Sequence, residues 1–264
     1  MGGVIVSKKT VVGLALGSGA ARGLAHIGVL KALEELNIDI DIISGSSAGA
    51  LIGGLYSTGI DPDMLKNLTI QIDKKMWMDF TVPRKGIIKG ERIEEILKLI
   101  TANRNIEELN KKLVIVATDL KTGEEVIFNK GPLYKAIRAS ISIPGVFEPV
   151  EYQGRTLVDG GVVDRIPISI LKKMGADIVI AIDVGFSKYQ SKVIHMFDIV
   201  LQSIDIMSKQ ITEPDLGLAD LIIRLPLSHI ESSDFELVEE CSIIGYETVM
   251  KNKEKIFNVL NNLK

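Results

Sequence analysis

The sequence predicts an α/β fold with three layers, α/β/α, around a mainly parallel central sheet. Short apolar runs typical of buried strands alternate with helical patterns along most of the chain, as in linked βαβ units. The chain has 264 residues, of which 46% are hydrophobic, so it can bury a full core. No repeat or linker composition interrupts it, and we expect a single domain over residues 1–264. The motif-bearing part covers about 11–185, and a C-terminal strand and helices cover about 186–264.

The first elements set the βαβ pattern. The run "TVVGLALG" predicts a buried strand, "RGLAHIGVLKALEELN" an amphipathic helix, and "IDIDIISG" a second strand. The run "AGALIGGLYSTG" predicts a helix that ends near Gly59 and Pro62. The uncharged stretch from Ile42 to Ile60 raises the alternative of a membrane span, but its serines, threonine and glycines favour a soluble helix.

The middle of the chain is more polar. Two helices are predicted, from "DPDMLKNLTIQIDKKMWMDF" and "KGERIEEILKLITAN", and their connection around Pro83 and Gly86 suggests an insertion or lid. The run "KKLVIVATDLKTGEEVIFN" predicts a strand that ends at Asp119, a turn and a returning strand. A short helix, "LYKAIRAS", then meets Pro144 and Gly145, which should break regular structure.

The last third repeats the α/β pattern. "PISILKKMG" predicts a helix, "ADIVIAIDVG" and "ADLIIRLPL" predict strands, and residues from about 234 to 264 predict one long helix.

Charge and cysteine content exclude several classes of protein. The balance of 31 basic and 34 acidic residues gives a net charge of -3, which disfavours a nucleic-acid partner. Cys241 is the sole cysteine, so no internal disulfide can form, and the lack of Cys and His clusters argues against a metal site. The N-terminal residues show no secretory signal. We therefore expect a cytoplasmic location, with a buried, inert Cys241 and no cofactor, and composition leaves the oligomeric state open.

The stretch Gly45-Ser46-Ser47-Ala48-Gly49 places a serine where a strand passes into a helix. Small neighbours permit a sharp turn that exposes the Ser47 hydroxyl, and the helix N-terminus offers free N–H groups to an oxyanion. The pattern predicts a nucleophile. The alternative is that Ser46 or Ser47 only caps the helix.

A second glycine-rich junction, "LGSGAARGLAH", again joins a strand to a helix. Its backbone N–H groups can converge on a negative oxygen, either of a phosphate or of a tetrahedral intermediate. A dinucleotide site is disfavoured, because the loop is one residue too long and Asp39 and Asp41 begin the next strand instead of ending it. Arg22 would either steady the loop or meet an anionic head group.

A serine nucleophile needs a base. In α/β-hydrolases the catalytic histidine comes last in the chain, which leaves His195 and His229 as candidates. His195 lies in a predicted helix and His229 follows a strand, so each is more consistent with a solvent-facing or packed histidine. His26 lies on the first helix and is more consistent with packing against the glycine loop. The alternative is Asp159 in "GRTLVDGGVVDRIP", where a glycine turn follows the carboxylate. An aspartate within reach of the serine can act as general base without an imidazole.

These elements, in this order, resemble the patatin-like phospholipase family, and its short bacterial members in particular. The resemblance rests on "GSGAARG", "GSSAG", "VIVATDL", "ASISIPGVFEPV" and "DGG". It implies a serine acyl-ester hydrolase of lipids with a catalytic dyad, Ser47 as nucleophile and Asp159 as base. It places the oxyanion hole at Gly19 and Ala20, with Arg22 at the family's usual basic position.

The resemblance also implies which residues surround the dyad. Loop and substrate positions are Gly17, Gly23 and Ala48, and motif glycines are Gly45, Gly49, Gly160 and Gly161. One departure is Ser18, which stands where the family's pattern has its first glycine. Backbone N–H groups form the hole, so this change need not abolish it.

In the expected reaction, Asp159 takes the Ser47 proton, Ser47 attacks the ester carbonyl, and water releases the acyl group. An ordinary aspartate is a feeble base, so we expect partial desolvation to raise the pKa of Asp159. Three other functions remain open: a catalytically weak adaptor with this fold, a Ser-His-Asp hydrolase and, less favoured, a nucleotide-binding protein.

The segment 74–80 has two interpretations. Its apolar side chains could form an acyl-chain mouth or touch a membrane surface, given the basic neighbours Lys74 and Lys75, but ordinary core packing of a helix is favoured. The apolar residues are Met76, Trp77, Met78 and Phe80.

Overall fold

The computed structural model describes residues 9–72, 76, 78–82, 85–185 and 196–261. The strands are β1 (Val12–Leu16), β2 (Ile42–Ser46), β3 (Gly86–Ile88), β4 (Lys112–Asp119), β5 (Glu125–Phe128), β6 (Gly145–Phe147), β7 (Val150–Tyr152), β8 (Arg155–Asp159), β9 (Ile178–Asp183) and β10 (Leu221–Arg224). The α-helices are α1 (Ala25–Glu35), α2 (Ala48–Ser57), α3 (Pro62–Gln71), α5 (Glu91–Ile100), α6 (Leu133–Ser140), α7 (Ile168–Lys173), α8 (Met196–Thr212), α9 (Val238–Lys251) and α10 (Lys253–Asn261). Short 3-10 helices are η1 (Ala20–Leu24), η2 (Ile106–Glu108), η3 (Gly160–Val162) and η4 (Glu213–Leu218).

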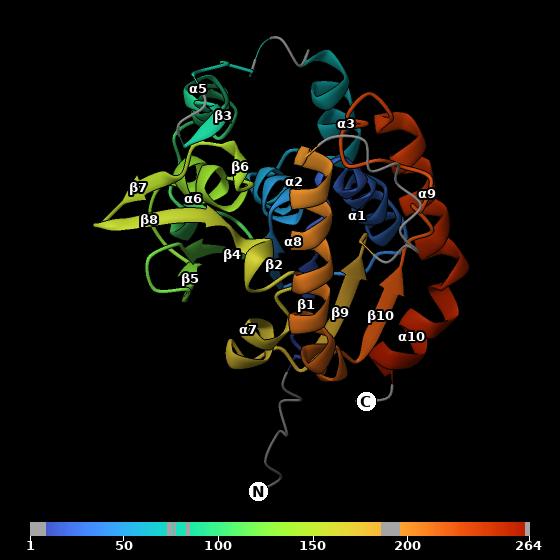
Figure 1. The fold of residues 1–264 in the computed structure, drawn as a ribbon. Coiled ribbons are helices and arrows are strands. Elements are labelled where there is room, and N and C mark those ends of the chain that lie inside the picture. The colour runs from blue at the N-terminus through green and yellow to red at the C-terminus, as the bar shows by residue number, and fades with distance from the viewer. Residues whose placement is uncertain (1–8, 73–75, 77, 83–84, 186–195, 262–264) are drawn as a thin grey trace, which may run out of the picture.

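An 8-stranded sheet forms the centre of the molecule (Figure 1), in the order β10-β9-β1-β2-β4-β8-β7, with β5 also paired to β4. From β10 to β4 all neighbours are parallel, whereas β5, β8 and β7 join in antiparallel fashion. The predicted α/β fold is confirmed, with a sheet that is mixed because an antiparallel extension follows β4.

Side chains on the two faces of the sheet enter separate cores, as the alternation of a strand requires. In β1, Leu14 and Leu16 join the larger core, which includes side chains of α1, α2 and α9. Ala15 points the other way, into a smaller core with Ile168 and Leu171 of α7. Because these parallel strands are buried on both faces, their sequences are continuous apolar runs.

Several expectations need correction. The C-terminal segment forms two helices, α9 and α10, instead of one, and Asn252 separates them. The run after Pro144 holds the short strands β6 and β7, and β6 pairs with β3 of the insertion. Cys241 is fully buried, as predicted.

The prediction that residues 74–80 pack in the core is wrong for two side chains. Met76 is 54% exposed and Phe80 is 71% exposed, and the Phe80 backbone forms an isolated β-bridge with Ile88 of β3. Met78 is half-buried. Lys74, Lys75 and Trp77 lie outside the described residues. Across the described part of the chain, no helix has both the length and the apolar character needed to cross a membrane.

Candidate active site

Ser47 stands at a strained turn between β2 and α2. Its backbone adopts φ 53° and ψ −120°, a conformation rare outside glycine. Gly49 makes this turn feasible, because a Cβ there would lie 2.0 Å from the Leu16 carbonyl oxygen of β1. The Ser47 side chain makes no capping hydrogen bond to α2, so the alternative that Ser47 serves only as a helix cap is wrong.

The turn is held by Ser140 at the end of α6. Its hydroxyl accepts a hydrogen bond from the Ser47 N–H at 2.9 Å and donates one to the Val116 carbonyl of β4 at 2.6 Å. Ser140 is completely buried. It therefore ties the Ser47 backbone to the neighbouring strand.

Sheet register brings Asp159 to Ser47. Asp159 ends β8 opposite Ala117 of β4, and β4 is also the neighbour of β2. Two further bonds fix its backbone: Thr118 Oγ1 donates to the Asp159 carbonyl at 2.8 Å, and the Asp159 N–H donates to the Ser142 carbonyl at 2.9 Å. The Ser47 hydroxyl then donates to Asp159 Oδ2 at 2.6 Å.

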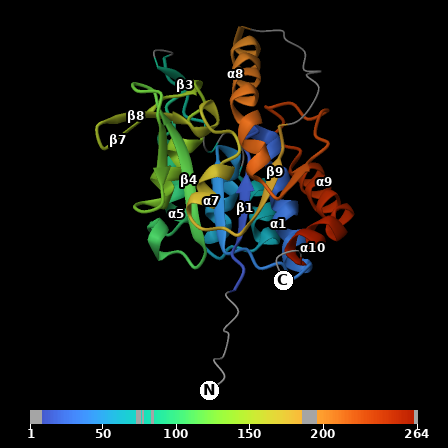
Figure 2. The same ribbon diagram turned by 90° about the horizontal axis from the view of Figure 1, so that it is seen from below.

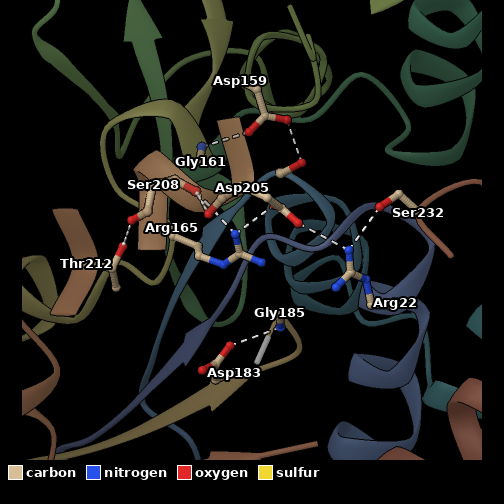
Figure 3. Close-up of polar contacts among 11 residues, drawn as sticks. Arg22, Asp159, Gly161, Arg165, Asp183, Gly185, Asp205, Ser208, Thr212 and Ser232 are labelled. Carbon is tan, nitrogen blue, oxygen red and sulfur yellow. Dashed lines mark hydrogen bonds and ion pairs between the residues drawn. The ribbon is translucent and has the colours of Figure 1, made fainter. Parts of the chain in front are cut away.

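The other carboxylate oxygen of Asp159 accepts the Gly161 N–H at 2.7 Å (Figure 3). Burial dominates the electrostatics and raises the pKa of Asp159 from 3.8 to about 7, while the hydrogen bonds from Ser47 and Gly161 partly oppose it. A carboxyl with a pKa near 7 is a far better proton acceptor at neutral pH than an ordinary aspartate.

The first glycine loop lies beside Ser47, because it follows β1 and β1 pairs with β2. Gly17 and Ser18 already donate their amides to backbone carbonyls, at 3.1 and 2.8 Å. Gly17 therefore shapes the loop and does not contribute a free donor. Within the described part of the chain, the amides of Gly19 and Ala20 have no acceptor, and Ala20 sits at φ 48°. These two N–H groups are the loop's candidates for an oxyanion hole.

Gly23 lets the loop approach helix α2, which follows Ser47. A Cβ on Gly23 would lie 2.2 Å from the Ala48 Cβ, so any larger residue would push η1 away from α2. The remaining motif glycines, Gly45, Gly160 and Gly161, lie in the two turns that carry Ser47 and Asp159.

Arg22 points from the loop to α8. Its Nη2 donates to Asp205 at 3.3 Å and to Ser232 at 3.0 Å, and Asp205 also accepts from Arg165 at 2.8 Å (Figure 3). The Arg165 carbonyl in turn accepts the Ser18 N–H. Of the two roles predicted for Arg22, these contacts match steadying of the loop.

Of the histidines that the structure describes, neither His26 nor His229 forms a triad with Ser47. His26 is fully buried and its Nε2 bonds to the Gly17 carbonyl at 2.8 Å. Burial lowers the pKa of His26 to about 4, so it stays neutral at neutral pH and packs against the loop, as expected. His229 is exposed and bonds to Glu240 at 2.9 Å. His195 lies outside the described residues.

Two cavities meet at Ser47. One, of about 450 Å³, is lined almost entirely by aliphatic side chains of α2, α3 and α5, including Leu51, Ile52, Leu55, Leu65, Leu68, Ile96, Leu97 and Ile100. The other, of about 350 Å³, is more polar and is lined by side chains that include Ser18, Arg22, Asp159, Gln202, Asp205 and Ser232. Both are lined by Ala20, Ser47, Ile143, Phe147 and Phe235. An ester held at Ser47 would have one aliphatic compartment and a second that is also largely apolar but carries polar and charged side chains.

Ser140 and Asp205 were not singled out from the sequence. Ser140 lies in "ASISIPGVFEPV", one of the runs that resemble the family, and this run is the sequence signal that could have identified it. Asp205 sits mid-helix with no local motif. Among the described residues, no group of three His, Cys, Asp or Glu side chains could hold a metal ion.

Comparisons with known proteins identify the family of the chain. The patatin-like phospholipase family model matches residues 14–172, more than half of the chain. An uncharacterized NTE family protein of Mycobacterium tuberculosis is 43% identical over 180 residues, which cover 67% of this chain and 50% of that protein. A lysophospholipase of Emericella nidulans is 34% identical over 180 residues, covering 66% of this chain and 12% of that protein. The chain thus spans at most half the length of these relatives.

Solved structures share the fold at low identity. VipD from Legionella pneumophila superposes with a TM-score of 0.63 at 15% identity, covering 92% of this chain and 66% of that chain. The type III effector ExoU superposes with a TM-score of 0.52 at 14% identity, covering 93% and 53%. With the family model matching through the strands and turns that carry Ser47 and Asp159, this chain belongs to the patatin-like phospholipase family.

Proposed function

We propose that the chain hydrolyses acyl esters of lipids through the Ser47–Asp159 dyad. The observation that carries the proposal is the 2.6 Å hydrogen bond from the Ser47 hydroxyl to Asp159, at the junction of an apolar and a polar cavity. A buried carboxyl with a raised pKa supplies the base, and a strained turn presents the nucleophile.

The reaction proceeds in two stages. Asp159 takes the hydroxyl proton as Ser47 Oγ attacks the ester carbonyl carbon, and the amides of Gly19 and Ala20 hold the oxyanion that forms. The C–O bond to the alcohol then breaks, and Asp159 returns the proton to the leaving alkoxide. Water, deprotonated by the same carboxylate, then attacks the acyl carbon. The bond from that carbon to Ser47 Oγ breaks, Asp159 returns the proton to Ser47 Oγ, and the fatty acid leaves.

The shapes of the cavities indicate the class of ester. The aliphatic cavity along α2, α3 and α5 suits one acyl chain, and the polar cavity suits the leaving alcohol with its head group. The name of the Emericella relative, lysophospholipase, points to substrates with a single chain. We therefore expect single-chain lipid esters to be better substrates than diacyl lipids.

Labelling with a fluorophosphonate tests the dyad directly. Peptide mapping should place the label on Ser47, Ser47→Ala should abolish labelling and hydrolysis of p-nitrophenyl acyl esters, and Asp159→Asn should lower both by several orders of magnitude. Ser46→Ala is the matched control, because it removes a neighbouring buried hydroxyl whose oxygen bonds to no described group. A folded protein that never labels would instead indicate an adaptor, and loss of activity in His229→Ala would indicate a triad.

A further inference from the structure

Between residues 199 and 211, the described side chains on the outward face of helix α8 carry no charge. Its exposed positions between residues 199 and 211 recur at helical spacing and include five apolar and two uncharged polar side chains. They are Ile199, Val200, Ser203, Ile206, Met207, Gln210 and Ile211. A stripe of this kind normally faces a core or a partner, yet here it faces outward.

The opposite face of α8 fixes this orientation. Asp205 binds the buried guanidinium groups of Arg22 and Arg165, and Ser208 accepts a second bond from Arg165 at 3.2 Å (Figure 3). Turning the apolar stripe inward would break these ion pairs and leave two buried arginines without their carboxylate. The stripe is therefore held outward by the same contacts that steady the glycine loop.

A second apolar surface lies beside β3, where Phe80 bridges to Ile88. Phe80 is 71% exposed and Val82 is 75% exposed. Between the two surfaces lies the polar cavity, which Met78 and Ile88 line from the insertion and Gln202 and Ile204 line from α8. Figure 2 shows α8 and β3 on the same edge of the molecule.

We propose that α8 and residues 78–82 dock on a lipid surface, with the opening of the polar cavity between them. This inference rests on the proposed function, since a lipid ester resides in a membrane or micelle and must enter from it. A protein partner or a second copy seated on both surfaces would cover the opening that leads to Ser47, whereas a lipid surface would deliver the substrate there. The uncharged stripe suits insertion of apolar side chains beneath the head groups.

Vesicle binding tests the docking apart from catalysis. Ser47→Ala protein is mixed with vesicles of uncharged phosphatidylcholine, and the bound fraction is measured by flotation. Adding Ile206→Glu should weaken binding about tenfold or more, because a carboxylate replaces an aliphatic side chain that would be buried in lipid. The matched control is Ile243→Glu on α9, since Ile206 is 44% exposed and Ile243 is 50% exposed in the free protein. The control should bind as the parent does.

Melting curves verify that each variant is folded, and Phe80→Ser provides an independent test of the second surface, with an expected loss of severalfold. Equal binding by Ile206→Glu and its parent, or equal loss in both glutamate variants, would overturn the proposal. So would a dimer, seen by sedimentation, that Ile206→Glu converts to monomer. Hydrolysis of a short water-soluble ester by the Ser47-containing protein reports separately on the proposed function, so failure of one leaves the other standing.

Discussion

The buried carboxyl of Asp159 should make catalysis and stability oppose each other. Its pKa rises from 3.8 to about 7 on folding, mainly through burial. Below the lower value both states are protonated and Asp159 has no effect on stability. Between the two values the folded state holds a proton that the unfolded state has lost, so stability falls as pH rises, and above about pH 7 the full destabilisation is present.

The magnitude follows from the interval between the two pKa values. About three pH units correspond to about 4 kcal/mol, since one unit is worth about 1.4 kcal/mol. Asp159→Asn removes the ionisation and keeps an acceptor for the Gly161 N–H. At about pH 8 the variant should therefore unfold with a free energy higher by up to about 4 kcal/mol, a rise in Tm on the order of 10 °C, although we expect it to be nearly inactive.

Urea or thermal unfolding of both proteins between about pH 5 and 8 measures this difference. The advantage of the variant should grow with pH. Asp39→Asn is the control: Lys9 binds Asp39 at 3.0 Å and holds the pKa of that carboxyl below its ordinary value, so this variant should be less stable than the parent by an amount that stays constant between about pH 5 and 8. A difference between Asp159→Asn and the parent that stays constant with pH would refute the reasoning. In the parent, kcat/KM should rise with pH through an apparent pKa near 7 as Asp159 becomes available as base.

Other substitutions test the supports of the site. Ser140→Ala leaves the buried Ser47 N–H without its acceptor, so it should lower stability by about 1–3 kcal/mol and reduce kcat more than it changes KM, as denaturant unfolding and steady-state kinetics would reveal; an unchanged kcat would mean that the turn keeps its shape unaided. Asp205→Ala removes the carboxylate that two buried arginines share. It should lower the free energy of unfolding by about 3 kcal/mol and reduce labelling by the fluorophosphonate. Normal labelling would show that the glycine loop does not depend on α8. Leu51→Trp fills the aliphatic cavity and should depress hydrolysis of long acyl esters about tenfold relative to acetyl esters; an equal effect on both would place the acyl chain elsewhere.

Much of this protein could be predicted from local sequence. Apolar runs and helical periods predicted the α/β fold, because strands buried on both faces and helices buried on one leave distinct patterns. Ser47 was accessible for the same reason: a sharp turn between a strand and a helix requires small neighbours at fixed spacing. The local patterns around Asp159 and the glycine loop were weaker, and they predicted a site only in combination with the pattern around Ser47.

Tertiary structure decided the rest. The bond between Ser47 and Asp159 depends on the register of β8 on β4, and no local pattern encodes contacts across 112 residues. The raised pKa of Asp159 depends on burial by distant segments. Asp205 reaches Arg22 from 183 residues away, and the exposure of Met76 and Phe80 contradicts the core packing that their hydrophobicity suggests. Sequence determined which residues can turn, cap and pack, since those preferences are local, whereas the chemistry at Ser47 depends on which side chains the fold brings to it and on how much water the fold excludes.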